Sequence, residues 1–291
     1  MKSADIARFL ALAVLFSLSF LFMRVASPQF GALVTTELRV LIAGLALTGV
    51  VLATRRPLLL REHWRGFLAV GALNAGIPFA LFAYAALHIP TGYSAILNSL
   101  MPIFAATFSA FMLDEKLTWR VFVGAAVGAA GAALLVQRGP VEVHTEVLLG
   151  ALACVLAITC YGFSAAYTKK YLAGLPAHGA AASTLLLAAV LLAPLAAVSL
   201  PATVPSLKAW LAVSGLAIFS TALAFILYYQ LMQAAGATQV AAVTFLLPAF
   251  GMLWGWIFLG EPITLAMIAG FLLAASAAGL VLAIGPFRRR S

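Results

Sequence analysis

Charged side chains are rare in this chain, and those inside apolar stretches are the ones that could do chemistry. The 291 residues include eight Asp and Glu, of which Glu37 alone falls inside a long apolar run, and Arg39 follows two residues later. If that run crosses a bilayer, a charge at its centre costs about 2.5–3.5 kcal/mol on insertion scales, so an acid there usually marks a pathway or a proton relay. Glu37 and Arg39 are therefore candidates for gating or coupling.

A structural role is the alternative for both residues. Glu37 and Arg39 are two residues apart, and on a helix this spacing places their side chains too far apart around the axis for an ideal ion pair. Near the outer end of the run, each side chain could snorkel to the membrane surface and help to hold the helix in place. Both interpretations stay open.

Uncharged polar side chains in the middle of apolar runs are better candidates for contact with a solute. Asn98 lies four residues before Pro102, and Thr244 lies four residues before Pro248. A buried Asn is costly unless it is paired, so these side chains should either line a wet cavity or bond to another helix. The prolines free backbone carbonyls, which could serve a hinge, a binding site or only a packing kink.

Further positions extend this candidate site. Ser94 and Met101 share a helix face with Asn98 at i, i+4 and i+7 spacing. Deep aromatic residues could add an apolar, partly hydroxylated pocket for an amphiphilic ligand, although packing alone is the alternative for each of them. The predicted substrate contacts are Asn74, Pro78, Phe79, Phe82, Tyr84, Ser94, Asn98, Met101, Tyr161, Phe163, Ser220, Tyr228 and Thr244.

The other reactive side chains form no catalytic or metal-binding pattern. Cys154 and Cys160 are six residues apart and project from different faces of a helix, which argues against a disulfide. The four histidines fall at loops or at the ends of apolar runs: His63, His88, His144 and His178. The sequence therefore predicts no metal, no cofactor and no enzymatic activity; a membrane-embedded enzyme or a scaffold is the disfavoured alternative.

The elements that must position these residues are membrane helices. The chain is 65% hydrophobic and 9% charged, whereas soluble domains carry about 25% charged residues. A spanning helix needs about 20 mostly apolar residues, and the chain has room for ten, with none left for an ATPase or a nucleic-acid module. The expected spans are 6–25, 33–54, 66–88, 92–113, 119–137, 147–169, 178–199, 207–233, 237–259 and 263–285.

The net charge of +9 indicates an orientation in the bilayer and not a nucleic-acid partner. With ten spans and the N-terminus inside, alternate loops collect Lys and Arg, whereas the opposite loops hold few. Short loops rich in Lys and Arg stay on the cytoplasmic side. We expect both termini to be cytoplasmic.

An internal repeat organises the chain. When the chain is shifted by 146 residues without a gap, residues of the same type superpose in the same order and spacing over a long stretch. Each half would contain five spans, and because this number is odd, the second half should enter the membrane in the opposite sense. Inverted repeats are typical of secondary transporters, with the substrate site at the midplane between the halves. The sequence thus predicts an all-α integral membrane fold of ten helices in two inverted five-helix repeats, 1–138 and 146–291, around a central cavity. The superposed pairs are Trp64 and Trp210, Asn74 and Ser220, Phe79 and Phe225, Pro102 and Pro248, Glu115 and Glu261, Thr118 and Thr264, and Gly124 and Gly270.

Two features of the repeat are expected to be structural. Glu115 and Glu261 each end one helix just before the next begins, where an acid favours the positive N-terminal end of the following helix. The fifth and tenth helices carry seams of small residues for close helix contact, which indicates a scaffold or a homodimer contact. The seam residues are Gly124, Gly128, Gly131, Gly270, Ala274, Ala275 and Ala278.

The stretch from Tyr84 to Leu135 resembles the signature of the drug/metabolite transporter superfamily, in particular its EamA branch. The second half repeats the pattern and is closer to the usual Leu-Gly-Glu, whereas the first half has Asp114 where Gly is common. The matching elements are Thr-Gly-Tyr-Ser-Ala at 91–95, Leu-Met-Pro at 100–102, Leu-Asp-Glu-Lys-Leu at 113–117, the Gly-rich helix at 124–131, Leu-Leu-Pro at 246–248 and Leu-Gly-Glu-Pro-Ile at 259–263.

The resemblance implies a carrier without its own ATPase that exports small amphiphilic metabolites, amino acids including aromatic ones above all, across the bacterial inner membrane. A multidrug or nucleotide-sugar carrier on the same fold is the alternative. The first helix carries Phe16, Ser17, Ser19 and Phe20 where that family often has Trp-Gly-x-Asn-Phe. The expected partners are a small-molecule substrate and the lipid bilayer.

Overall fold

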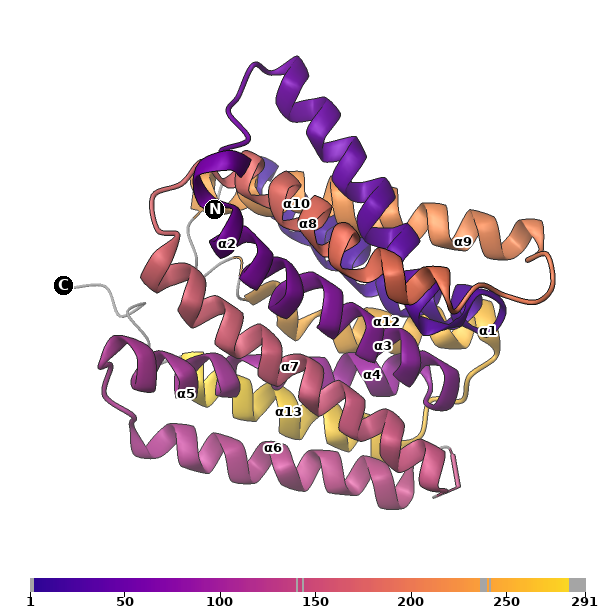
Figure 1. The fold of residues 1–291 in the computed structure, drawn as a ribbon. Helices are drawn as coiled ribbons and strands as arrows, with labels where there is room; N and C mark the ends of the chain where they lie inside the picture. The colour runs from indigo at the N-terminus through magenta and orange to yellow at the C-terminus, as the bar shows by residue number, and fades with distance from the viewer. Residues whose placement is uncertain (1–2, 140, 143, 236–239, 241, 283–291) are drawn as a thin grey trace.

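The elements are helices throughout the part of the chain that the computed structural model describes, residues 3–139, 141–142, 144–235, 240 and 242–282 (Figure 1). No strand occurs among these residues. In chain order the elements are α1 (Ser3–Ala53), α2 (Leu60–Gly71), η1 (Ala72–Gly76), α3 (Ile77–His88), α4 (Thr91–Asn98), α5 (Met101–Leu113), α6 (Trp119–Arg138), α7 (Thr145–Tyr171), α8 (Ala177–Ala197), α9 (Leu207–Ala217), η2 (Ile218–Leu223), α10 (Ala224–Ala235), η3 (Val243–Phe245), α12 (Leu247–Leu259) and α13 (Leu265–Leu282).

Helix α1 contains two helical segments joined at a bend. Its 51 residues would measure about 77 Å if straight, more than twice the thickness of the hydrocarbon layer. Gly31 breaks the helix with φ 75° and ψ 166°, a conformation that residues with a Cβ rarely adopt. The expected spans 6–25 and 33–54 therefore follow one another without a loop.

The helices as a set match a multi-pass membrane protein. Seven helical stretches of the described part, α1 among them and some made of two or three successive elements, are long and apolar enough to cross a bilayer. Two shorter apolar helices, Val243–Leu259 and Leu265–Val281, follow them. Large apolar side chains are exposed along these helices, for example Val190 at 68% and Leu45 at 58%, as lipid-facing surfaces require. The expected ninth span begins at residue 237, and its first residues lie partly outside the described residues.

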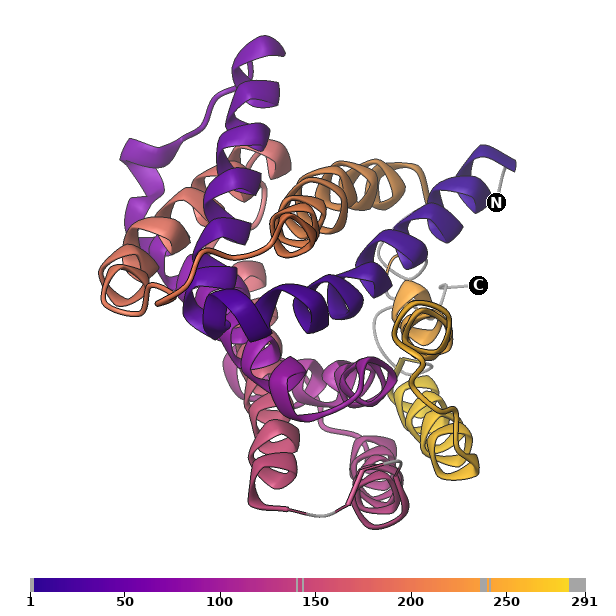
Figure 2. The same ribbon diagram turned by 90° about the vertical axis from the view of Figure 1, so that its right-hand side faces the viewer.

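The seam of small residues joins α6 to α13 within one chain, where the two helices lie side by side (Figures 1 and 2). A Cβ on Gly124 would lie 3.0 Å from the carbonyl oxygen of Ala277, and one on Gly131 would lie 3.3 Å from that of Gly270. The glycines are therefore used inside the chain. A homodimer through these helices stays a prediction and would have to use their other faces.

The same departures from α-helical geometry occur twice, about 146 residues apart. The π-helical turns η1 and η2 begin at Ala72 and Ile218. Helices α5 and α12 both end at a residue in the left-handed conformation, Asp114 with φ 54° and Gly260 with φ 67°. Asp is tolerated there because its short polar side chain permits a conformation that Gly adopts freely.

Close packing of α5 against α7 depends on Gly162. A Cβ there would lie 2.6 Å from the backbone carbonyl carbon of Phe104, whereas one on the exposed Gly49 would meet nothing within 4 Å. We expect Gly162→Ala to lower the free energy of unfolding by about 1–3 kcal/mol because backbone must shift. Gly49→Ala should be neutral or stabilising, since Ala favours the helix. Thermal unfolding of the purified protein in detergent measures both, and equal midpoints would contradict this packing.

Candidate functional site

Arg39 lies in the interior of the molecule and is only 6% exposed. Its Nε donates to the hydroxyl of Thr221 at 2.9 Å, and Nη2 donates to the hydroxyl of Ser19 at 3.0 Å. Nη1 lies 3.8 Å from the sulfur of Met23, and the guanidinium carbon is 3.4 Å from the centre of the Phe79 ring. Arg39 does not snorkel to the membrane surface, so that interpretation of the sequence is wrong.

The bend in α1 and the two π-helical turns bring this cluster together. Ser19 precedes Gly31 in α1 and Arg39 follows it, so the bend allows the two segments to face each other. Thr221 lies in η2, and its hydroxyl donates to the carbonyl of Leu216 at 2.9 Å while it accepts from Arg39. Phe79 follows η1 closely. Irregular turns of this kind often occur at functional sites.

Aromatic rings adjoin the Arg39 cluster. Phe82 stacks on Tyr161 with ring centres 6.1 Å apart and meets the edge of Phe20 at 5.7 Å. Tyr161 is near enough to Arg39 to interact with it electrostatically. Three of the predicted contacts, Phe79, Phe82 and Tyr161, are thus grouped around one buried cation.

Other predicted aromatic contacts lie in separate groups. Phe163 packs edge-on against Phe108 at 5.4 Å and belongs to the contact between α5 and α7. Tyr84 lies over the ring of His88 at 4.7 Å, near the end of α3. Tyr228 in α10 lies 6.5 Å from Phe16. The ring contacts of these three residues thus involve other partners than Arg39, and a single pocket for all the predicted rings stays a prediction.

The expected shared face of Ser94, Asn98 and Met101 crosses a helix boundary. Ser94 and Asn98 lie one turn apart within α4, and a turn at Ser99 and Leu100, both in right-handed helical conformation, leads into α5 at Met101. The shared face of all three stays a prediction. Ser94 is buried, whereas Asn98 is half-buried and makes no hydrogen bond to another described residue. Asn98 stays a candidate for contact with a solute.

Three prolines begin helices. Pro102 and Pro248 lie in the first turns of α5 and α12, and Pro78 lies in the first turn of α3 after η1. Proline is tolerated at such positions because the first N–H groups of a helix lack intrahelical partners. The predicted mid-helix kinks are thus helix starts that follow irregular turns.

The remaining predicted residues occupy the irregular turns or stand apart. Asn74 is half-buried in η1, Ser220 is buried in η2 beside Thr221, and Thr244 is half-buried in η3. Glu37 is half-buried and forms no ion pair with Arg39; its Oε2 is buried without a hydrogen-bond partner.

Glu261 caps a helix, but a different one from that expected. Its Oε2 accepts from the backbone N–H of Thr91 at 2.9 Å, at the start of α4, and its Oε1 lies 3.5 Å from Nε of Arg24. The following helix, α13, is capped instead by the hydroxyl of Thr264, which accepts from the N–H of Met267 at 3.2 Å. Burial raises the pKa of Glu261, although Thr91 and Arg24 act in the opposite direction.

The corresponding acid of the first half has another partner. Glu115 pairs with Lys169 near the end of α7, and Lys170 beside it donates to the carbonyl of Met112 at 2.8 Å. The Glu115 and Lys169 side chains are 40% and 51% exposed. Glu115 therefore does not cap the next helix, and the expectation for both acids is corrected.

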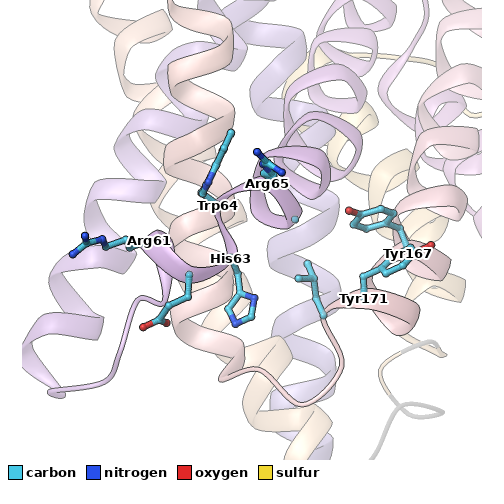
Figure 3. Close-up of a pocket in the computed structure, with 9 residues that line it drawn as sticks. Arg61, His63, Trp64, Arg65, Tyr167 and Tyr171 are labelled. Atoms are coloured by element: carbon cyan, nitrogen blue, oxygen red, sulfur yellow. The ribbon is translucent and has the colours of Figure 1, made fainter.

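An open pocket of 430 Å³ lies where α2 begins and α7 ends (Figure 3). Arg61 and Arg65 extend to opposite sides in this view, so they do not converge on a common ligand. The pocket is separate from the Arg39 cluster and was not expected from the sequence. It is lined by Arg61, Glu62, His63, Trp64, Arg65, Gly66, Tyr167, Tyr171 and Leu172.

Several polar contacts were missed by sequence reasoning. Ser19 and Thr221 bind Arg39, and Ser17 accepts from the indole N–H of Trp254 at 2.8 Å. The available signal was a hydroxyl in an otherwise apolar run, since a buried hydroxyl needs a partner. Its partner could not be identified because the contact between Arg39 and Thr221 spans 182 residues.

Comparisons with known proteins agree with this architecture. The model of the EamA-like transporter family matches residues 5–137 and 148–283. A solved crystal structure with 22% sequence identity covers 96% of both chains with a TM-score of 0.66, which shows a shared fold.

Three curated relatives match most of the chain. The uncharacterized transporter YvbV of Bacillus subtilis is 28% identical over 84% of this chain and 80% of its own length. Protein PecM of Dickeya dadantii is 27% identical over 78% and 76%. A probable terminal-alkyne amino-acid exporter of Streptantibioticus cattleyicolor is 27% identical over 81% and 79%.

The contacts of the two acids predict unequal effects on stability. Glu261→Ala would leave the Thr91 N–H and Arg24 without their acceptor, which should cost about 1–3 kcal/mol. Glu115→Ala removes a half-exposed ion pair, which should cost less than about 1 kcal/mol. Thermal unfolding of both variants in the same detergent compares them. A larger loss for Glu115→Ala would contradict the assigned contacts.

Proposed function

Because the chain belongs to the EamA-like transporter family, we propose that it exports small amphiphilic metabolites, amino acids including aromatic ones above all, by alternating access. It is a multi-pass membrane protein whose relatives are named as transporters and exporters. The proposed site of export is the bacterial inner membrane, with both termini in the cytoplasm.

The observation that carries this proposal is the buried cluster around Arg39. It combines a cation with the rings of Phe79, Phe82 and Tyr161, and an amphiphilic solute offers matching polar and apolar parts. Its contacts come from α1, α3, α7 and η2, so the cluster adjoins elements of both proposed halves. A relative named as an amino-acid exporter supports this choice of cargo.

The proposed architecture is ten spans in two inverted halves, 1–138 and 146–291. The bend at Gly31 supports two spans within α1. The two short apolar helices, Val243–Leu259 and Leu265–Val281, would supply the ninth and tenth. The π-helical turns and left-handed helix ends that recur about 146 residues apart favour equivalent halves.

The moving parts in this proposal are the expected third, fourth, eighth and ninth spans, which hold α2 to α3, α4 and α5, α9 to α10, and η3 with α12. The break between α4 and α5 and the turn before α12 interrupt helices where transporters build their sites. Helices α4 and α12 also approach closely, because a Cβ on Gly251 would lie 2.7 Å from that of Ala95. Small sliding between such packed helices is one way to alternate access.

A multidrug carrier on the same fold is the weaker candidate. A cationic drug would meet the buried charge of Arg39, and Glu37 is not paired with it. Like charges repel strongly where water is excluded. The cluster therefore favours a neutral, zwitterionic or anionic solute.

Export from cells tests the proposal. Bacteria that overproduce the protein and are loaded with Phe, Tyr and Trp should release them faster than cells with an empty vector. Asn98→Ala should reduce this release several-fold at equal membrane abundance, because its half-buried side-chain amide makes no hydrogen bond to another described residue and is available to a solute. Gly49→Ala is the matched control and should not change the rate. No release of any amino acid would remove the proposed cargo.

A further inference from the structure

Among the described residues, no acid forms an ion pair with Arg39. Four ion pairs occur among the described residues, and none of them includes Arg39. Its nitrogen atoms contact two hydroxyl groups and a thioether, and its plane lies over a ring. These partners are neutral.

An arrangement of this kind is costly unless an anion completes it. Arginine stays protonated in proteins, and the effective penalty for burying an ion is several kcal/mol. Neutral hydrogen bonds and a ring face recover part of this penalty but leave the net charge in place. Only an anionic partner can neutralise the charge that remains.

The guanidinium also has hydrogen-bonding capacity left. It carries five N–H groups, of which one on each of the three nitrogens is engaged with Thr221, Ser19 or Met23. One N–H therefore remains on each terminal nitrogen. A carboxylate can accept from two N–H groups of one guanidinium, which gives both strength and geometry.

We propose that Arg39 binds the carboxylate of the exported substrate while Phe79, Phe82 and Tyr161 contact its apolar side chain. This inference rests on the proposed export function and narrows its substrates to small carboxylates with an apolar or aromatic part. The amino group of an amino acid is not required by Arg39. Monocarboxylates without an amine therefore belong to the same substrate class.

A purely structural link is the competing explanation. In that case Arg39 would only hold α1 against η2, and the protein would not distinguish an acid from its amide. The two explanations therefore differ in ligand discrimination and not in the stability of variants.

The test uses the purified full-length protein and two ligands of the same shape, 3-phenylpropionate and 3-phenylpropionamide. Wild type should be stabilised against heat by the carboxylate at about tenfold to hundredfold lower concentration than by the amide, the ratio expected for a charge-assisted hydrogen bond. Arg39→Lys should retain part of this preference, and Arg39→Gln should reduce the ratio to about one. Arg120→Gln removes an exposed arginine beside Trp119 and should leave the ratio unchanged.

Each outcome decides the inference. The inference would be overturned if acid and amide stabilised wild type at equal concentrations, even if amino acids are exported. It would also be overturned if a folded Arg39→Gln variant kept the wild-type ratio between the two concentrations. A carboxylate preference that depends on Arg39 would support it even if no amino acid leaves loaded cells, so failure of the proposed export is seen separately. If both Arg39 variants misfold, the ratio in wild type alone decides.

Discussion

The hydrocarbon layer offers no hydrogen bonds, and this constraint governs where the chain can depart from a helix. Every N–H and C=O in lipid needs a partner within the protein, so most of the chain is helical. The π-helical turns η1 and η2 and the break before Met101 are departures that must be covered by other helices. Ala75, Ser220 and Leu100 lie in them and are buried, so each irregular segment turns at least one side towards the interior.

The same constraint concentrates polar side chains at a few places. Arg39 is joined to hydroxyls from two parts of the chain, and Glu261 is joined to the start of α4 and to Arg24. Both groups link segments that are far apart in sequence. A membrane protein cannot place such groups at random, because each unpaired polar group costs several kcal/mol. These polar contacts therefore lie at junctions between helices.

Features that depend on neighbouring residues could be predicted from the sequence, whereas contacts between residues far apart in the chain could not. Apolar length predicted helices that span a membrane, and small residues predicted close helix contact, although not that α6 and α13 would contact each other. The turn between Asn98 and Met101 was not predicted, because such a break depends on how neighbouring helices pack. The predicted capping by Glu261 had the right chemistry and the wrong helix, since Thr91 is 170 residues away.

By itself, the amino-acid sequence determined the class of the protein: a multi-pass helical membrane protein, because hydrophobicity and charge act additively along the chain. It also determined that few acids are present to neutralise a buried cation. Only the tertiary structure decided that Arg39 lies in the interior among Ser19, Thr221 and Phe79. A snorkelling arginine and a buried one have the same local sequence, and the difference arises from the bend at Gly31 and from the packing of distant helices.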